Sequence, residues 1–204
     1  MGAIQLSLLE RAPPAPKVDP VFDGLRRTDL GAGAWVDYAP RWLLGDTQVY
    51  DALLERSEWS EGRRLMYERF VDVPRLMGAL PEDGGHPIVR HIAEVLSRRY
   101  DARFDALSVA LYRNGRDSVA WHRDKGLRDQ PESTLALVSL GEPRPFRLRP
   151  VGGGTSTGFR CGWGDLVVLG GTVQRHWEHA VPKVGHAAPR MVLMLRCTRD
   201  TRLG

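Results

Sequence analysis

The chain has 204 residues, a formal net charge of +4 at pH 7 and a pI of about 9.4. This length suits one domain with a sizeable core, and no apolar run is long enough to cross a membrane. The first residues lack the basic and apolar segments of a secretory signal, so we expect a cytoplasmic protein. The two cysteines, Cys161 and Cys197, suggest no disulfide framework and lack metal-ligand spacing.

Residues 1–20 are rich in proline and predict a flexible tail or an extended strap. Within this tail, Gln5, Leu6, Ser7, Leu8 and Leu9 resemble the short peptide by which bacterial replication and repair proteins dock on the sliding clamp. A mobile tail with a glutamine and an apolar end suits insertion into a groove. The sliding clamp is therefore a candidate partner, and a plain terminal strand or disordered arm is the alternative.

Residues 21–104 predict short strands and two helices. The first helix follows Asp46-Thr47, starts with an N-cap and places three apolar residues on one side, which are Val49, Leu53 and Leu54. The second helix begins at Pro87 and carries an apolar stripe with amphipathic spacing, formed by Ile88, Ile92, Val95 and Leu96. We interpret both apolar faces as parts of the core.

From residue 105 onward the pattern changes to short strands separated by glycine-rich turns. The strands are predicted at residues 108–112, 135–140, 146–149, 166–169 and 191–195. The sequence thus predicts an α+β, mainly β fold, a double-stranded β-helix or jelly roll with supporting helices on one outer face. Residues 21–204 would form one domain, with 21–104 as an N-terminal extension and 105–200 as the jelly-roll core.

A candidate metal site begins at His122-Arg123-Asp124. On a strand, side chains two residues apart point to the same face, so His122 and Asp124 would lie together. His179 is the candidate third ligand, with His176 as its competitor. Two imidazoles and one carboxylate on one side of a metal are typical of non-haem Fe(II) oxygenases, because they leave coordination positions open. Zinc more often takes a closed tetrahedral site.

Two arginines flank the last predicted strand. Arg190 and Arg196 are separated by an apolar segment without glycine or proline, which favours a buried strand with both arginines on one face. Guanidinium groups bind carboxylates well, so the two side chains could bracket a small dicarboxylate. The alternative is an edge residue that reaches to solvent or a surface ion pair.

Several motifs, in this order, resemble the AlkB family of 2-oxoglutarate- and Fe(II)-dependent dioxygenases. The likeness covers about residues 105–200 and rests on Leu111-Tyr112-Arg113-Asn114, His122-x-Asp124, Gly164-Asp165-Leu166, Trp177-x-His179-x-Val181-Pro182 and Pro189-Arg190 with five residues to Arg196. The same motifs select His179 over His176 as the third ligand.

The resemblance implies a jelly-roll enzyme that uses Fe(II), 2-oxoglutarate and O2. By this resemblance His122, Asp124 and His179 hold the iron, while three other residues bind the co-substrate, which are Tyr112, Arg190 and Arg196. The implied reaction is oxidative dealkylation of N-alkylated bases in DNA or RNA, with release of formaldehyde and succinate. A base in a duplex must be flipped or single-stranded to react, so residues 21–104 would also supply a nucleotide lid.

Three positions depart from the family pattern. Ala110 stands where the family usually has Asn, Gly126 where many members have an acidic residue, and no aromatic segment follows Pro74-Arg75-Leu76. Candidates for a base-covering aromatic are Trp35, Tyr38, Trp42, Trp59 and Tyr67.

The basic character of the chain agrees with a nucleic-acid partner. Arginines gather in three groups that could hold phosphates, which are Arg63, Arg64, Arg69 and Arg75, then Arg98, Arg99 and Arg103, and then Arg144, Arg147 and Arg149. Two other functions stay open. One is an iron-dependent hydroxylase or demethylase of a protein or small molecule, and the other is a jelly-roll binding module with a vestigial metal site. We expect a monomer.

Overall fold

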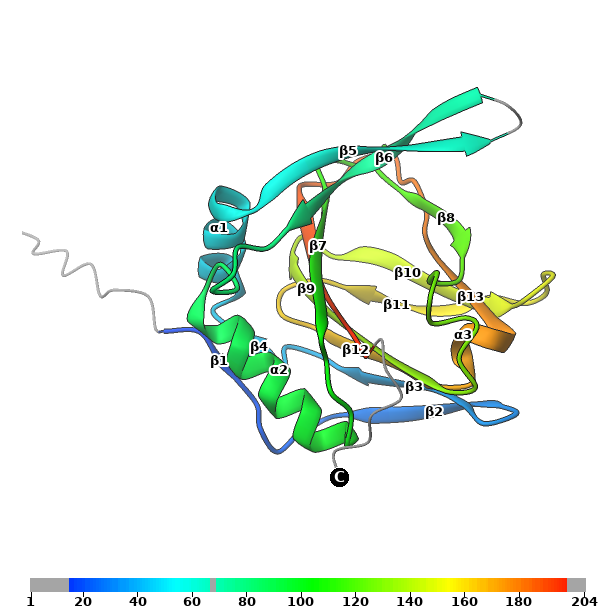
Figure 1. The fold of residues 1–204 in the computed structure, drawn as a ribbon, viewed down its shortest axis with the longest axis horizontal. Helices are drawn as coiled ribbons and strands as arrows, with labels where there is room; N and C mark the ends of the chain where they lie inside the picture. The colour runs from blue at the N-terminus through cyan, green and yellow to red at the C-terminus, as the bar shows by residue number, and fades with distance from the viewer. Residues whose placement is uncertain (1–14, 67–68, 198–204) are drawn as a thin grey trace, which may run out of the picture.

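The structure is a computed structural model that describes residues 15–66 and 69–197, without the side chains of residues 63–73. Antiparallel strands dominate it, and two longer helices lie on one outer side (Figure 1). The predicted mainly β jelly roll with helices on one outer face is therefore confirmed. Among the described residues, no helix is long and apolar enough to span a membrane.

Two sheets face each other and form the body of the molecule. The larger has eight strands, in the order β2 (Arg26–Gly31), β3 (Ala34–Ala39), β12 (Leu166–Gly171), β9 (Ser133–Gly141), β14 (Arg190–Arg196), β7 (Ala106–Tyr112), β6 (Arg69–Ala79) and β5 (Glu58–Met66). The smaller has four strands, in the order β11 (Thr157–Cys161), β10 (Arg144–Pro150), β13 (Trp177–Val181) and β8 (Val119–His122). Each of the five predicted strands lies within an observed one.

Alternation along the strands divides the apolar residues between two cores. On β14, Met191, Leu193 and Leu195 point to the core beneath the helices, whereas Val192 and Met194 point between the sheets. The period of two places Arg190 and Arg196 on the same inner face as Val192 and Met194. The charged ends of β14 therefore border the space between the sheets.

The described residues also form three helices, α1 (Asp46–Arg56), α2 (Pro87–Tyr100) and the short α3 (Val173–His176). The predicted start of α2 is confirmed, and the His86 side chain caps it by accepting a hydrogen bond from the Ile88 N–H. For α1 the predicted side-chain cap was wrong, because Gly45 occupies the cap position. Leu54 is also partly exposed rather than in the core.

The segment before residue 105 supplies four strands of the large sheet, which are β2, β3, β5 and β6. Lys17–Val18 forms β1, which pairs with β4 (Leu43–Leu44) in a separate two-stranded sheet, so the end of the predicted tail packs against the body of the protein. Strands β5 and β6 form a long hairpin whose outer part extends past the sheets (Figure 1). The candidate clamp peptide at residues 5–9 lies outside the described residues.

Candidate functional site

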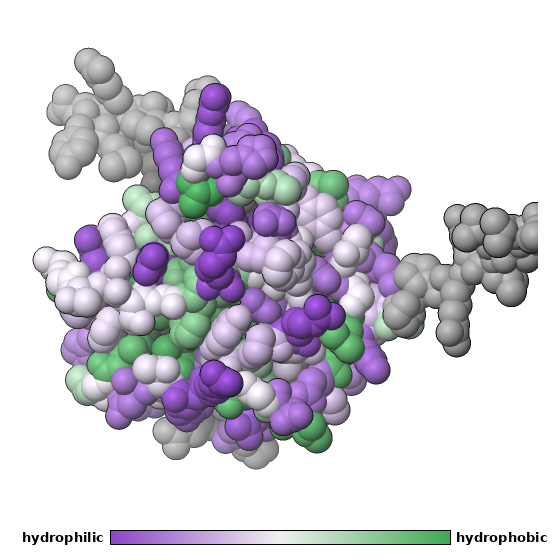
Figure 2. Space-filling view, turned by 180° about the vertical axis from the view of Figure 1, so that it is seen from behind, coloured by the Kyte–Doolittle hydropathy of each residue, from purple (hydrophilic) through white to green (hydrophobic). Residues whose placement is uncertain are grey.

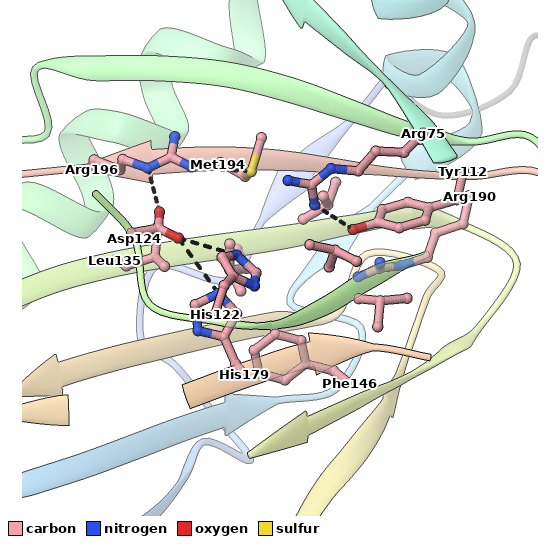
Figure 3. A pocket seen from close by; sticks show the side chains of 14 residues that line it. Arg75, Tyr112, His122, Asp124, Leu135, Phe146, His179, Arg190, Met194 and Arg196 are labelled. Carbon is pink, nitrogen blue, oxygen red and sulfur yellow. Dashed lines mark hydrogen bonds and ion pairs between the residues drawn. The ribbon is translucent and has the colours of Figure 1, made fainter. Parts of the chain in front are cut away.

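A pocket between the two sheets contains the predicted site residues (Figure 3). Its lining comes from β6, β7, β9 and β14 of the large sheet and from β8, β10 and β13 of the small sheet. Apolar side chains form the middle of the lining, while polar groups gather in two places. One is a cluster of His122, Asp124 and His179, and the other surrounds Tyr112 and Arg190.

The first polar cluster has the geometry of a metal site. The Asp124 Oδ1 atom lies 3.5 Å from His122 Nε2 and 3.6 Å from His179 Nε2. The three candidate ligand atoms all fall within 4.8 Å of one another. His122 and His179 lie directly opposite each other on paired strands, which explains how two residues far apart in sequence meet. The donor set, two imidazoles and a carboxylate, fits a divalent iron ion.

Asp124 reaches this cluster by a route that strand periodicity did not predict. Strand β8 ends at His122, so Asp124 lies in the loop that follows and not on the strand. Its N–H donates to Oε1 of the buried Gln174 at 2.9 Å, and its Oδ2 accepts from Arg196 Nε at 2.6 Å. The prediction of a shared strand face was therefore wrong, although the two side chains still converge.

The protonation states of this cluster suit a metal cation. Burial chiefly lowers the pKa of His179, to about 3, with a further contribution from His122, so its ring is neutral near pH 7. Burial alone would raise the pKa of Asp124, but the hydrogen bond to His122 and the charge and hydrogen bond of Arg196 hold the pKa of Asp124 below its usual range. A neutral imidazole and an ionised carboxylate are the forms that bind metals.

The second polar cluster offers donors without matching acceptors. Arg190 is buried, and its Nη2 donates to Ser139 Oγ at 2.8 Å. Its Nε and Nη1 are buried and find no partner among the described residues. Tyr112 is also buried, with its hydroxyl 2.9 Å from Arg75 Nη1. Such a cluster fits a carboxylate, because buried donors are costly unless they are paired.

The two arginines of β14 have different partners in the structure. Arg196 donates to Asp124 and, at 3.0 Å, to Ser108 Oγ, so its guanidinium belongs to the candidate metal site. Only Arg190 stands beside Tyr112, with its guanidinium 5.4 Å from the ring centroid. These contacts do not agree with the expectation that both arginines bracket one dicarboxylate.

Other candidates lie away from the pocket. His176 is exposed at the end of α3, whereas His179 is buried in the site. The described candidates for a base-covering aromatic do not line the pocket, and these are Trp35, Tyr38, Trp42 and Trp59. Tyr67 lies outside the described residues. Large aromatic side chains in the extension are used for packing instead, as in the stack of Trp35 on Tyr100.

The arginines that could hold phosphates have different surroundings in the structure. Arg144 is fully buried and donates to the carbonyls of Asn114, Asp117 and Pro182, so it is unavailable to a ligand at the surface. Arg149 pairs with Glu178 at 2.6 Å. Arg75 lines the pocket. Tertiary contacts of this kind leave no local sequence pattern, and for the same reason Gln174 was not foreseen.

Comparisons with known proteins agree with this geometry. A family model described as "2OG-Fe(II) oxygenase superfamily" matches residues 52–203. The human "Alpha-ketoglutarate-dependent dioxygenase alkB homolog 3" is 32% identical over 130 residues, which cover 57% of this chain and 44% of that protein. The "DNA oxidative demethylase ALKBH2" of Arabidopsis thaliana is 30% identical over 105 residues, which cover 40% of this chain and 33% of that protein.

The fold has matches among solved structures as well. One titled "The structure of OsALKBH1" superposes with a TM-score of 0.52 at 16% identity, over 84% of this chain and 99% of that chain. At this identity the match supports the fold alone. The matched part of the human relative is less than half of its length.

Proposed function

Because the chain belongs to the 2OG-Fe(II) oxygenase superfamily, we propose that it is an oxidative dealkylase of N-alkylated bases in DNA or RNA. The reaction consumes 2-oxoglutarate and O2, hydroxylates the N-alkyl carbon and releases succinate, CO2 and, from a methyl group, formaldehyde. The observation that carries the proposal is one pocket with a His-Asp-His cluster and, apart from it, unpartnered arginine donors. Relatives named alkB homolog 3 and DNA oxidative demethylase support the substrate class.

The residues proposed to hold Fe(II) are His122, Asp124 and His179. Three protein ligands on one side leave coordination positions for the co-substrate and O2. When bound, the iron and its co-substrate supply the oxidation, while the protein contributes orientation and excludes side reactions. The chain's own part is to keep Asp124 in place, which Arg196 and Gln174 do through its carboxylate and its backbone N–H.

The proposed binding residues for 2-oxoglutarate are Arg190 and Tyr112, with Arg196 acting through Asp124. The far carboxylate of the co-substrate would accept a hydrogen bond from Arg190, whose Nε and Nη1 atoms are without partners among the described residues. Its other end would then point along the apolar lining toward the metal ligands. The apolar residues of this lining exclude water from the reacting groups.

The proposed nucleic-acid substrate would approach the side of the pocket where the β5–β6 hairpin projects (Figure 1). This hairpin belongs to the extension that we propose as a nucleotide lid, and its Arg75 reaches the pocket lining. The surface seen in Figure 2 carries small separate hydrophobic patches among hydrophilic residues. We also propose that the protein is a monomer and that it lies in the cytoplasm.

An assay of succinate formation tests the proposed function. Protein supplied with Fe(II) and 2-oxoglutarate is incubated with oligonucleotides that carry defined methylated bases, in single and double strands. We expect succinate and formaldehyde to form together and to depend on the methyl group. Turnover only with a protein or small-molecule substrate would redirect the proposal to another hydroxylase or demethylase, and absence of both iron binding and turnover would favour a binding module.

We also propose that residues 1–12 bind a bacterial sliding clamp through Gln5, Leu6, Ser7, Leu8 and Leu9. The sequence pattern alone supports this partner. A peptide of residues 1–12 should bind the clamp, and changing Gln5 and Leu8 to Ala should abolish that binding. No measurable binding by the unchanged peptide would remove the proposal.

A further inference from the structure

Arg75 has contacts that the proposed roles of the other residues do not explain. It lies on β6 and is the one member of the β5–β6 hairpin among the described residues that line the pocket. The pairing of Leu76 with Leu111 brings Arg75 beside Tyr112. Its Nη1 donates to the Tyr112 hydroxyl oxygen at 2.9 Å, and its buried Nε has no partner among the described residues.

The direction of this hydrogen bond fixes what Tyr112 can do. A guanidinium has only donors, so the Tyr112 oxygen must accept from Arg75. The hydroxyl hydrogen of Tyr112 then has to donate elsewhere, and the described residues offer it no acceptor. Figure 3 shows this hydroxyl between Arg75 and the pocket. Arg75 therefore sets Tyr112 as a donor for whatever the pocket binds.

The positive charges around Tyr112 are also not balanced by acidic side chains among the described residues. Three guanidinium groups, those of Arg75, Arg144 and Arg190, lie 5.4–5.9 Å from its ring centroid. Arg144 donates from Nη1 and Nη2 to backbone carbonyls, although its buried Nε has no partner among the described residues. Neither Arg75 nor Arg190 has an acidic partner among the described side chains. Two cations that face one pocket repel each other, and a bound anion would relieve that repulsion.

We propose that Arg75 is a further binding residue for the far carboxylate of the dicarboxylate co-substrate. It orients the Tyr112 hydroxyl toward that carboxylate and adds its own positive charge to that of Arg190. The proposal rests on the placement of the co-substrate given above and is independent of the nucleic-acid substrate. Arg75 belongs to the β5–β6 hairpin, so a side chain of the proposed nucleotide lid would also contact the co-substrate.

Binding of two related 2-oxo acids to the Mn(II)-loaded protein tests this role by calorimetry. One is 2-oxoglutarate, and the other is 2-oxopentanoate, which has the same chain without the far carboxylate. Arg75→Met should raise the Kd for 2-oxoglutarate by about tenfold or more, since hydrogen bonds to charged groups are strong. The Kd for 2-oxopentanoate should stay within about twofold, because it lacks the group that Arg75 recognises. Arg75→Lys should restore part of the loss.

Two further variants separate this role from general damage. Arg56→Met removes an arginine that pairs with the exposed Asp83 at 2.6 Å and should leave both Kd values unchanged. In a Tyr112→Phe background, Arg75→Met should cost less than it does in the unchanged protein, because part of its action passes through the hydroxyl. Equal weakening of both 2-oxo acids would mean structural damage and would overturn the proposal.

The remaining outcomes are also decisive. An unchanged Kd for 2-oxoglutarate together with a raised KM for a methylated oligonucleotide would assign Arg75 to the nucleic acid and refute the co-substrate role. Failure of the unchanged protein to bind 2-oxoglutarate would remove both this inference and the proposed function. Normal binding by the unchanged protein and by Arg75→Met would remove this inference alone.

Discussion

The two polar clusters of the pocket differ in how completely the protein satisfies them. Around Asp124, both carboxylate oxygens have partners, the backbone N–H is held by Gln174, and Arg196 balances the negative charge. Around Tyr112, the guanidinium groups of Arg75, Arg144 and Arg190 each have an N–H donor without an acceptor among the described residues. The candidate metal site is thus organised by the protein itself, whereas the arginine cluster needs an anion to complete it.

This difference assigns ligand charge to each cluster. A site that already balances its own charges and presents a neutral imidazole and a carboxylate suits a cation. A site with unpaired cations suits a carboxylate, and it loses little in the free protein if one cation is removed. Variants in the two clusters should therefore affect different ligands, and this separation can be tested.

Asp124→Ala should have the largest effect, because it removes a proposed metal ligand. We expect Mn(II) affinity to fall by at least about 100-fold and turnover to be lost. Calorimetric titration with Mn(II) measures the first and succinate formation the second. Asp129→Ala, which changes an exposed acid of the neighbouring turn, is the matched control. Unchanged metal affinity in Asp124→Ala would contradict the assignment.

Arg190→Met should act on the other ligand. Loss of its free N–H groups should raise the Kd for 2-oxoglutarate by about 10- to 100-fold and leave Mn(II) affinity unchanged. Since Arg190 has no acidic partner in the described structure, thermal unfolding without co-substrate should show no loss of stability.

Arg190→Lys is the companion variant. Lysine keeps the positive charge but lacks the planar arrangement of N–H donors in a guanidinium. The affinity of this variant for 2-oxoglutarate should therefore fall between those of Arg190→Met and the unchanged protein. A parallel fall in metal affinity in either variant would show that the two clusters are not separable.

Much of the fold followed from local patterns. The strand ranges, the start of α2 and the shared face of Arg190 and Arg196 depend on periodicity and on proline, which the sequence displays directly. Ordered motifs identified His122, Asp124 and His179, and the structure brings these three together. Whether each residue has its proposed role stays a prediction.

What sequence reasoning missed depends on contacts between distant segments. Asp124 lies past the end of its strand, and its backbone N–H donates a hydrogen bond to Gln174, fifty positions away. Arg196 turns to Asp124 rather than to Arg190's cluster, although periodicity places both arginines on one face. Periodicity gives the face of a side chain but not its partner, and the partner decides its role.

Arg196→Met should sharpen the comparison with a smaller effect. The variant removes the 2.6 Å contact to Asp124 Oδ2 without removing a proposed ligand. Metal affinity should fall by about tenfold, as is usual when a ligand loses the group that orients it. With Mn(II) at saturation, the Kd for 2-oxoglutarate should change by less than about threefold. A larger change in this Kd would indicate that Arg196 itself binds 2-oxoglutarate.

The smallest effect is expected outside the pocket, at a hydrogen-bond network around the buried Asp37. Tyr100 donates to Asp37 Oδ2 at 2.9 Å, and Arg27 pairs with the same carboxylate at 2.7 Å. Burial, then the charge of Asp37 and the hydrogen bond to it, raise the pKa of Tyr100 above its usual value near 10. The native state therefore holds this proton more tightly than the unfolded chain does.

The stabilisation linked to this proton is fully present below about pH 10 and is lost as the pH rises further, by up to about 1.4 kcal/mol per unit. Tyr100→Phe should cost about 1 kcal/mol at pH 7 and should lose less stability than the unchanged protein between about pH 10 and 11. Urea unfolding at several pH values measures both. Affinities for Mn(II) and 2-oxoglutarate at pH 8 should stay the same in this variant, because neither polar cluster contacts Tyr100. A change in either affinity would mean that packing far from the pocket, and not only the direct contacts of each polar cluster, controls binding there.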